Sequence, residues 1–175
     1  MIILLLYGFS KAGKDTVAEL LVHEHGFRRF AFADRVKEIA AKQIQVPLEW
    51  FHDVNKKNTL LHGKTLRQYC IEIGEGGRTV DPEFWGKQVV QAIQSEGCER
   101  IVLSDWRCYP EFFAIQKAFP AATIIPIHIV RKDQYVSPVP DMTEYNLSGF
   151  PFQITFYNNG QTLEELRQQI NNLSL

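Results

Sequence analysis

The sequence predicts an α/β fold in which a parallel sheet of five strands is covered by helices on both faces. Short apolar runs alternate along the chain with longer amphipathic stretches, which is the pattern of successive βαβ units. The first run, Ile2 to Tyr7, is apolar throughout and therefore indicates a strand buried on both faces. The 175 residues, 45% of them hydrophobic, suffice for one core, so we expect a single domain over residues 1–175.

The first helix and the second strand follow from local signals. Apolar residues on one side predict a helix over 14–25, which Gly26 ends. Residues 27–32 alternate between apolar and polar and predict a strand. Asp34 is then placed to cap a helix over 35–43.

Two further helices are expected before the third strand. One covers 65–73 and the other 82–96, with Asp81 at its N-cap and Pro82 at its first position. Because this material follows the second strand, residues 34–98 are predicted to form a helical insertion in the domain.

The second half of the chain returns to strand–helix alternation. Pro126 predicts an edge position or an irregularity in its strand, because proline cannot donate a ladder hydrogen bond. Residues 131–149 are polar and contain two prolines, so we expect a lid segment there. The remaining elements are expected as a strand at 101–104, a helix at 111–119, strands at 122–130 and 152–157, and a helix at 162–172.

Composition excludes several classes of protein. The net charge of -1 and the pI near 6.5 give no basic surplus for a nucleic-acid polymer. No apolar run approaches the about 20 residues of a membrane span, and the first run lacks the basic flank of a signal peptide. We therefore expect a cytoplasmic protein without membrane association. The cysteines, which form no CxxC pair, indicate a reducing compartment and no zinc site; they are Cys70, Cys98 and Cys108.

A glycine-rich loop of the form GxxxxGK lies between the first strand and the first helix, which is the context that phosphate binding requires. Its glycines let backbone N–H groups surround phosphate oxygens, and the helix N-terminus adds about half a positive charge. Lys14 is expected to hold the β- and γ-phosphates. The alternative is a turn that only joins strand to helix. The residues predicted to bind a nucleotide are Gly8, Ser10, Lys11, Ala12, Gly13, Lys14, Asp15 and Thr16.

Two carboxylates are candidate magnesium ligands. The residue after such a lysine is usually Ser or Thr, but here it is Asp15, a hard oxygen ligand that suits Mg²⁺. Asp105 follows an apolar strand and should lie at the carboxyl edge of the sheet, facing the loop. The alternative for Asp105 is a helix cap or a turn. Thr16 would then hydrogen-bond a phosphate.

Four arginines fall near the ends of predicted elements. A kinase whose acceptor is already phosphorylated must bring two anions together, and arginine binds phosphate through a bidentate fork. We expect at least two of these arginines to contact phosphate, although each alone could be a solvated surface charge. They are Arg67, Arg78, Arg107 and Arg131.

These motifs together resemble the phage-type deoxynucleoside monophosphate kinases, a branch of the P-loop nucleoside monophosphate kinases. The chain is more distantly similar to animal-type phosphomevalonate kinases and dephospho-coenzyme A kinases. The matching pieces are the GKDT sequence at 13–16, Phe32-Ala33-Asp34 with Lys37, Arg67-Gln68 with Gly74 and Arg78, Phe84-Trp85, Ser104-Asp105-Trp106-Arg107 with Glu111, and Asn158-Asn159-Gly160.

The resemblance implies a three-layer P-loop kinase fold, the use of ATP and Mg²⁺, and host cytoplasm if the gene is a phage gene. It places Asp34 and Lys37 in a monophosphate pocket, with Arg67 and Arg78 on the acceptor phosphate. Further implied roles are base contacts for Gln68 and Trp85, an adenine contact for Asn158 and Gly160, an acidic turn containing Glu144, and catalytic roles for Lys14, Asp105, Arg107 and Arg131. Core packing is the alternative for Gln68, Phe84 and Trp85.

The expected reaction is transfer of the γ-phosphoryl group from Mg-ATP to a deoxynucleoside monophosphate, a small-molecule partner. One rival is a P-loop kinase for another phosphorylated metabolite. A second is a nucleotide-binding module without transfer activity, although the N-K-x-D element of GTPases is absent because Lys57 and Asn58 follow Asn55-Lys56. A homodimer is left open.

Overall fold

The computed structural model describes residues 1–53, 55–56, 58–132, 145–159 and 162–173. Its main sheet has five parallel strands, as the sequence predicts, and their order is β2-β5-β1-β6-β7. Their bounds are β1 Ile2–Tyr7, β2 Arg28–Phe30, β5 Arg100–Leu103, β6 Thr123–Val130 and β7 Ile154–Tyr157.

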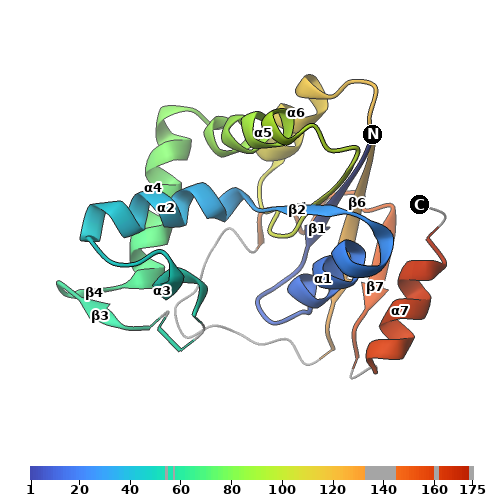
Figure 1. Ribbon diagram of the computed structural model, residues 1–175, viewed down its shortest axis with the longest axis horizontal. Coiled ribbons are helices and arrows are strands. Elements are labelled where there is room, and N and C mark those ends of the chain that lie inside the picture. The colour runs from blue at the N-terminus through green and yellow to red at the C-terminus, as the bar shows by residue number, and fades with distance from the viewer. Residues whose placement is uncertain (54, 57, 133–144, 160–161, 174–175) are drawn as a thin grey trace.

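Helices lie on both faces of this sheet (Figure 1). A short antiparallel hairpin, which the sequence did not predict, joins two of the helical segments. The helices are α1 Lys14–His25, α2 Phe32–Ile44, α3 Glu49–His52, α4 Leu66–Val80, α5 Phe84–Glu96, α6 Tyr109–Ala118 and α7 Leu163–Asn171, and the hairpin strands are β3 Leu60–Leu61 and β4 Lys64–Thr65. Within the described residues, no helix is both long and apolar enough to span a bilayer.

The alternation of side chains along β1 divides the core into two layers. Leu4 and Leu6 pack with residues of α1 and α7 on one face. Ile3 and Leu5 pack with residues of α5 and α6 on the other face. Because successive strand side chains point to opposite faces, one fully apolar strand serves both layers.

The region between β2 and α5 extends away from the sheet as an arm (Figure 1). Its helices α2, α3 and α4 enclose a small core of their own, to which Ala40, Phe51 and Leu66 contribute. Of the predicted insertion 34–98, therefore, α2 to α4 form the arm, whereas α5 covers the sheet.

Two predicted helix starts were wrong. Asp34 does not cap α2: the helix begins at Phe32, and the carboxylate of Asp105 accepts its first N–H groups. Asp81 is not the N-cap of α5, because that helix begins at Phe84 after Glu83. The Asp81 carboxylate instead accepts the N–H of Glu83 at 2.9 Å within the turn between α4 and α5.

Of the two alternatives predicted for Pro126, an edge strand or an irregularity, the edge strand is wrong, because β6 lies between β1 and β7. Pro126 is aligned with Leu5 of β1, and the pairing with β7 begins one residue later, at Ile127. Residue 126 therefore lies just before the part of β6 that pairs with β7. This explains how an inner strand accommodates a proline.

Two adjacent glycines of α4 provide a test of packing between α4 and α5. A Cβ on Gly77 would lie 2.7 Å from the Trp85 ring, whereas a Cβ on Gly76 would meet nothing within 4 Å. Gly77→Ala should therefore destabilise the protein by about 1–3 kcal/mol through overpacking. Gly76→Ala should stabilise it by about 0.5–1 kcal/mol. Urea unfolding measures both, and equal effects would contradict the close contact.

Candidate active site

The loop after β1 has a backbone that requires glycine at two points. Gly13 has a φ of +106°, and a Cβ there would lie 2.4 Å from Nδ2 of Asn158. A Cβ on Gly8 would lie 2.4 Å from the carbonyl oxygen of Ile129. The loop is thus pressed against the ends of β6 and β7. Because Gly13 occupies the N-cap of α1 and has no side chain, it leaves the N–H groups of the first turn directed at an incoming anion.

Lys14 lies across this loop. Its Nζ donates to the carbonyl oxygens of Gly8 at 2.7 Å and Phe9 at 2.9 Å. The ammonium group is therefore held over the loop at the N-terminus of α1. A cation beside a helix N-terminus is an arrangement suited to binding an anion.

The far side of the loop is braced by residues that follow β6 and β7. Asn158 donates through Nδ2 to the carbonyl oxygen of Ala12 at 2.9 Å, and Arg131 donates to that of Lys11 at 3.2 Å. These contacts place both predicted site residues against the loop. Gly160 and Glu144 lie outside the described residues.

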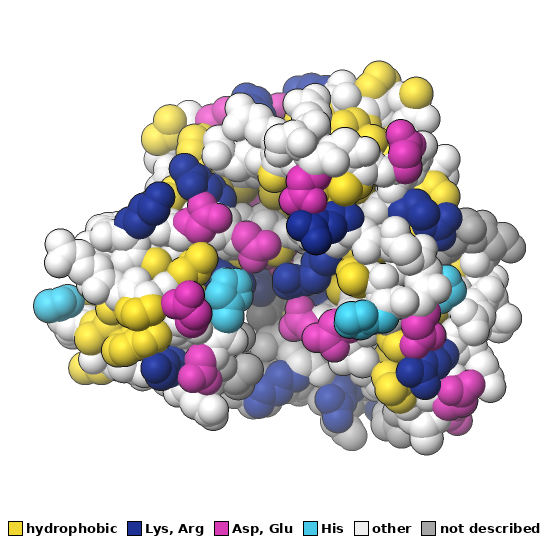
Figure 2. Space-filling view, in the orientation of Figure 1, with side chains coloured by type: hydrophobic (Ala, Val, Ile, Leu, Met, Phe, Trp, Pro, Cys, Tyr) yellow, Lys and Arg dark blue, Asp and Glu magenta, His cyan; other side chains and the backbone are white. Residues whose placement is uncertain are grey.

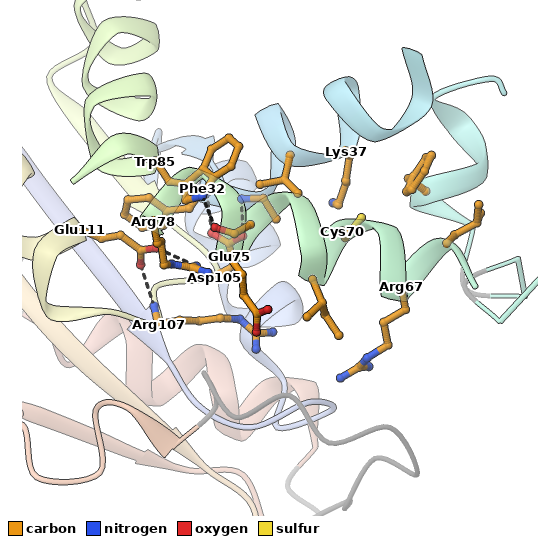
Figure 3. Close-up of a pocket in the computed structure, with 16 residues that line it drawn as sticks. Phe32, Lys37, Arg67, Cys70, Glu75, Arg78, Trp85, Asp105, Arg107 and Glu111 are labelled. Carbon is orange, nitrogen blue, oxygen red and sulfur yellow. Dashed lines mark hydrogen bonds and ion pairs between the residues drawn. The ribbon is translucent and has the colours of Figure 1, made fainter. Parts of the chain in front are cut away.

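A cavity of about 200 Å³ opens between α2, α4 and the turn after β5. One part of its wall is apolar and includes Phe32, Val36, Phe51, Leu66 and Ile71. The face of the molecule seen in Figure 2 is hollowed near its middle, and basic side chains lie around the hollow. The charged side chains that line the cavity, all of them labelled in Figure 3, are Lys37, Arg67, Glu75, Arg78, Asp105, Arg107 and Glu111.

Asp105, which follows β5 of the sheet, binds the start of α2 beside this cavity. One carboxylate oxygen accepts the N–H of Phe32 at 2.7 Å and the other accepts that of Ala33 at 2.9 Å (Figure 3). An anion at the N-terminus of α2 also interacts favourably with the helix dipole. In this structure Asp105 therefore positions α2, which was the alternative that the sequence offered for it.

The two carboxylates predicted to bind magnesium, Asp15 and Asp105, have different surroundings. The side chain of Asp15 is 82% exposed and lies 3.7 Å from the guanidinium group of Arg29. Among the described residues, no three His, Cys or carboxylate side chains form a metal-binding cluster. A magnesium ion bound to a nucleotide needs fewer than three ligands from the protein, because one or two carboxylates and the phosphates themselves coordinate it.

Glu111 contributes a buried carboxylate to the cavity. Its side chain lies 3.3 Å from Nη2 of Arg78, and it accepts the N–H groups of Arg107 and Cys108 at 3.1 Å each. Burial raises the pKa of Glu111, and the charge of Arg78 opposes that shift. Sequence reasoning gave this residue no role. The signal was available, because a glutamate in the first turn of a helix with a nearby proline commonly binds backbone N–H groups.

The remaining predicted substrate residues differ in their surroundings. Trp85 is 2% exposed and donates through Nε1 to the Gly74 carbonyl oxygen at 2.8 Å, with part of the side chain lining the cavity. Gln68 does not line the cavity, because its side chain accepts the N–H of Thr65 and caps α4. Lys37 lines the cavity and lies 3.6 Å from the Asp34 carboxylate.

Comparison with known proteins bears on the fold. No protein-family model and no curated protein matches the chain. Among solved structures, the chain is similar to a putative kinase from Chloroflexus aurantiacus, with a TM-score of 0.54 and 14% identity over 98% of this chain and 97% of that one. It is also similar to a sugar kinase from Janibacter sp. HTCC2649, with a TM-score of 0.51 and 15% identity over 98% and 93%. The predicted fold class is confirmed: the chain has the three-layer α/β fold of P-loop kinases.

The capping role of Asp105 predicts a loss of stability that does not depend on magnesium. Asp105→Ala leaves two N–H groups of α2 without an acceptor and should cost about 1–3 kcal/mol. Asp105→Asn keeps one acceptor oxygen and should cost less. Asp15→Ala removes an exposed carboxylate and should stay within about 0.5 kcal/mol of the parent. Denaturant unfolding without magnesium measures all three, and an Asp105→Ala variant as stable as the parent would contradict this role.

Proposed function

We propose that the protein is an ATP-dependent kinase that transfers the γ-phosphoryl group to the phosphate of a deoxynucleoside monophosphate. One observation carries the proposal. The phosphate loop follows β1 and the turn with Asp105 and Arg107 follows β5, and these two strands are parallel hydrogen-bonded neighbours. Their carboxyl ends therefore open at the same edge of the sheet, so a donor at the loop faces an acceptor in the cavity.

The cationic side chains have distinct roles in this scheme. Lys14 binds the β- and γ-phosphates of the donor, and Arg131, whose guanidinium group contacts the loop, binds the transferring group. Arg67, Arg78 and Arg107 line the cavity and bind the acceptor phosphate. An acceptor phosphate is already ionised, so the transfer needs positioning and neutralised charge rather than a general base.

Magnesium is proposed with ATP, and it would neutralise charge on the phosphates during transfer. Asp15 and Asp105 are the proposed ligands. Asp15 is exposed at the start of α1, where a turn of its side chain away from Arg29 would present it to a metal. Asp105 already accepts two backbone N–H groups, so it would serve through a water rather than directly. Ser10 and Thr16 are the further proposed phosphate contacts, and Asn158 with Gly160 borders the adenine.

The apolar part of the cavity favours an acceptor with a flat, weakly polar group beside its phosphate. Phe32, Phe51 and the edge of Trp85 supply aromatic surface, and Lys37 supplies a donor. A nucleobase fits this description, because it stacks on aromatic rings and accepts hydrogen bonds. The Gln68 amide, which caps α4, would contact a base only after leaving Thr65.

A coupled assay with ATP and a panel of monophosphates tests the substrate. We expect ADP production with at least one deoxynucleoside monophosphate. Thermal-shift measurements with phosphomevalonate and dephospho-coenzyme A test the nearest rivals. ADP production with one of these and with no deoxynucleotide would reject the nucleotide assignment. ATP binding without binding of any acceptor would favour a module without transfer activity.

The role of Lys14 gives a further prediction. Lys14→Ala should lower kcat/KM by about 10²- to 10³-fold, because the charge that stabilises the departing phosphoryl group is lost. Lys42→Ala removes an exposed lysine near the end of α2 and serves as the matched control, which should retain the parent rate. Steady-state kinetics under saturating magnesium make the comparison. Parent-like turnover by the Lys14 variant would reject the phosphate-loop mechanism.

A further inference from the structure

Glu111 is the most buried acidic side chain at the cavity. The residue is 1% exposed. One oxygen faces Arg78 of α4, and the other accepts the N–H groups of Arg107 and Cys108 in the turn after β5 (Figure 3). A single carboxylate thus connects two separate elements, each of which supplies an arginine to the cavity.

The packing of α5 against α6 fixes the position of this carboxylate. A Cβ on Gly86 would lie 2.6 Å from Cβ of Ala114 and 3.3 Å from Cα of Glu111, so α5 closely approaches the start of α6. The backbone that carries Glu111 therefore has little room to move. A carboxylate on a closely packed backbone keeps its position and can therefore orient the groups that bind to it.

The positive charges of Arg78 and Arg107 explain why a carboxylate is present beside them. Two guanidinium groups that line one cavity repel each other and are costly to bring together out of water. An anion beside Arg78 offsets part of this cost before any acceptor has bound. A side chain with one oriented ion pair also has fewer conformations to lose when it binds a phosphate.

We propose that Glu111 is a positioning residue for the acceptor-phosphate site, where it orients Arg78 through its carboxylate and the turn at Arg107 through the backbone. This inference rests on the proposed kinase function, because it assigns Arg78 and Arg107 to the acceptor phosphate. Glu111 itself binds no substrate atom. Its effect passes through the two arginines.

The charged and titratable groups around Glu111 are Arg78 from α4 and Asp105, Arg107 and Cys108 from the turn after β5; α5 contributes the uncharged Gly86. Burial raises the pKa of Glu111, with Asp105 adding to the shift and Arg78 opposing it. A carboxylate with a raised pKa gains its proton at a higher pH than an exposed glutamate does. Orientation of Arg78 should therefore weaken as the pH falls toward that raised pKa.

Glu111→Gln tests the proposal, because it keeps the shape and removes the charge. The KM for the acceptor monophosphate should rise about 10-fold or more, since a charged hydrogen bond to Arg78 is lost. The KM for ATP should change less than twofold, because the loop lies on another part of the sheet edge. The dependence of the acceptor KM on pH should also become weaker in the variant than in the parent.

Glu165→Gln is the matched control. Glu165 stands at the same position of α7, where its carboxylate accepts the N–H of Thr162, but it lies on the opposite face of the sheet. The Glu165 variant should leave both KM values unchanged. Equal changes in the KM for ATP and for the acceptor, or an unchanged acceptor KM in the Glu111 variant, would overturn the proposal.

A second measurement separates this inference from the kinase assignment. The guanidinium Nη–H signal of Arg78 in ¹⁵N NMR spectra, assigned by its loss in Arg78→Lys, should exchange slowly in the parent and rapidly in Glu111→Gln, because Nη2 is the atom that contacts Glu111. An equally protected signal in both proteins would reject the positioning role even if the enzyme is active. Absence of turnover by the parent with every monophosphate would reject the kinase assignment, and the NMR comparison would still decide the role of Glu111.

Discussion

The parallel pairing of β1 with β5 is the constraint on which the rest of the site depends. Each residue of Ile2 to Leu5 is aligned with a residue of Arg100 to Leu103, so the two chains leave the sheet at the same edge. The glycine-rich loop continues from β1 and the turn with Asp105 from β5. Parallel strands need a long crossover, and here that crossover contains α1, β2 and the arm that forms the cavity wall.

Asp105 connects the end of β5 to α2, the first helix of the arm. Because its carboxylate binds the first N–H groups of α2, the helix starts at a defined point beside the end of β5. Glu111 contacts α4 in a different way, through an ion pair with the side chain of Arg78 near the end of that helix. Two acidic side chains that follow β5 thus contact the two helices between which the cavity lies.

The sequence predicted the elements whose signals are local. Helix α1 and its end at Gly26 were found to the residue, because a strand, a glycine loop and an apolar period all occur within a short segment. Boundaries that depend on distant partners were missed. Asp34 looks like a cap by its spacing, but Asp105, distant in sequence, takes that role. Likewise, Pro126 is tolerated in an inner strand because its neighbour β7 begins to pair only after it.

The sequence alone determined the fold class and the glycine-rich loop between β1 and α1, since burial pattern, glycine positions and the lysine are properties of consecutive residues. Tertiary structure decided which arginines share a cavity, that Gln68 caps α4, and that Asn158 braces the loop. It also showed that Glu111 is buried between Arg78 and the turn at Arg107. These contacts join residues from separate elements, and their geometry exists only after the helices have packed on the sheet.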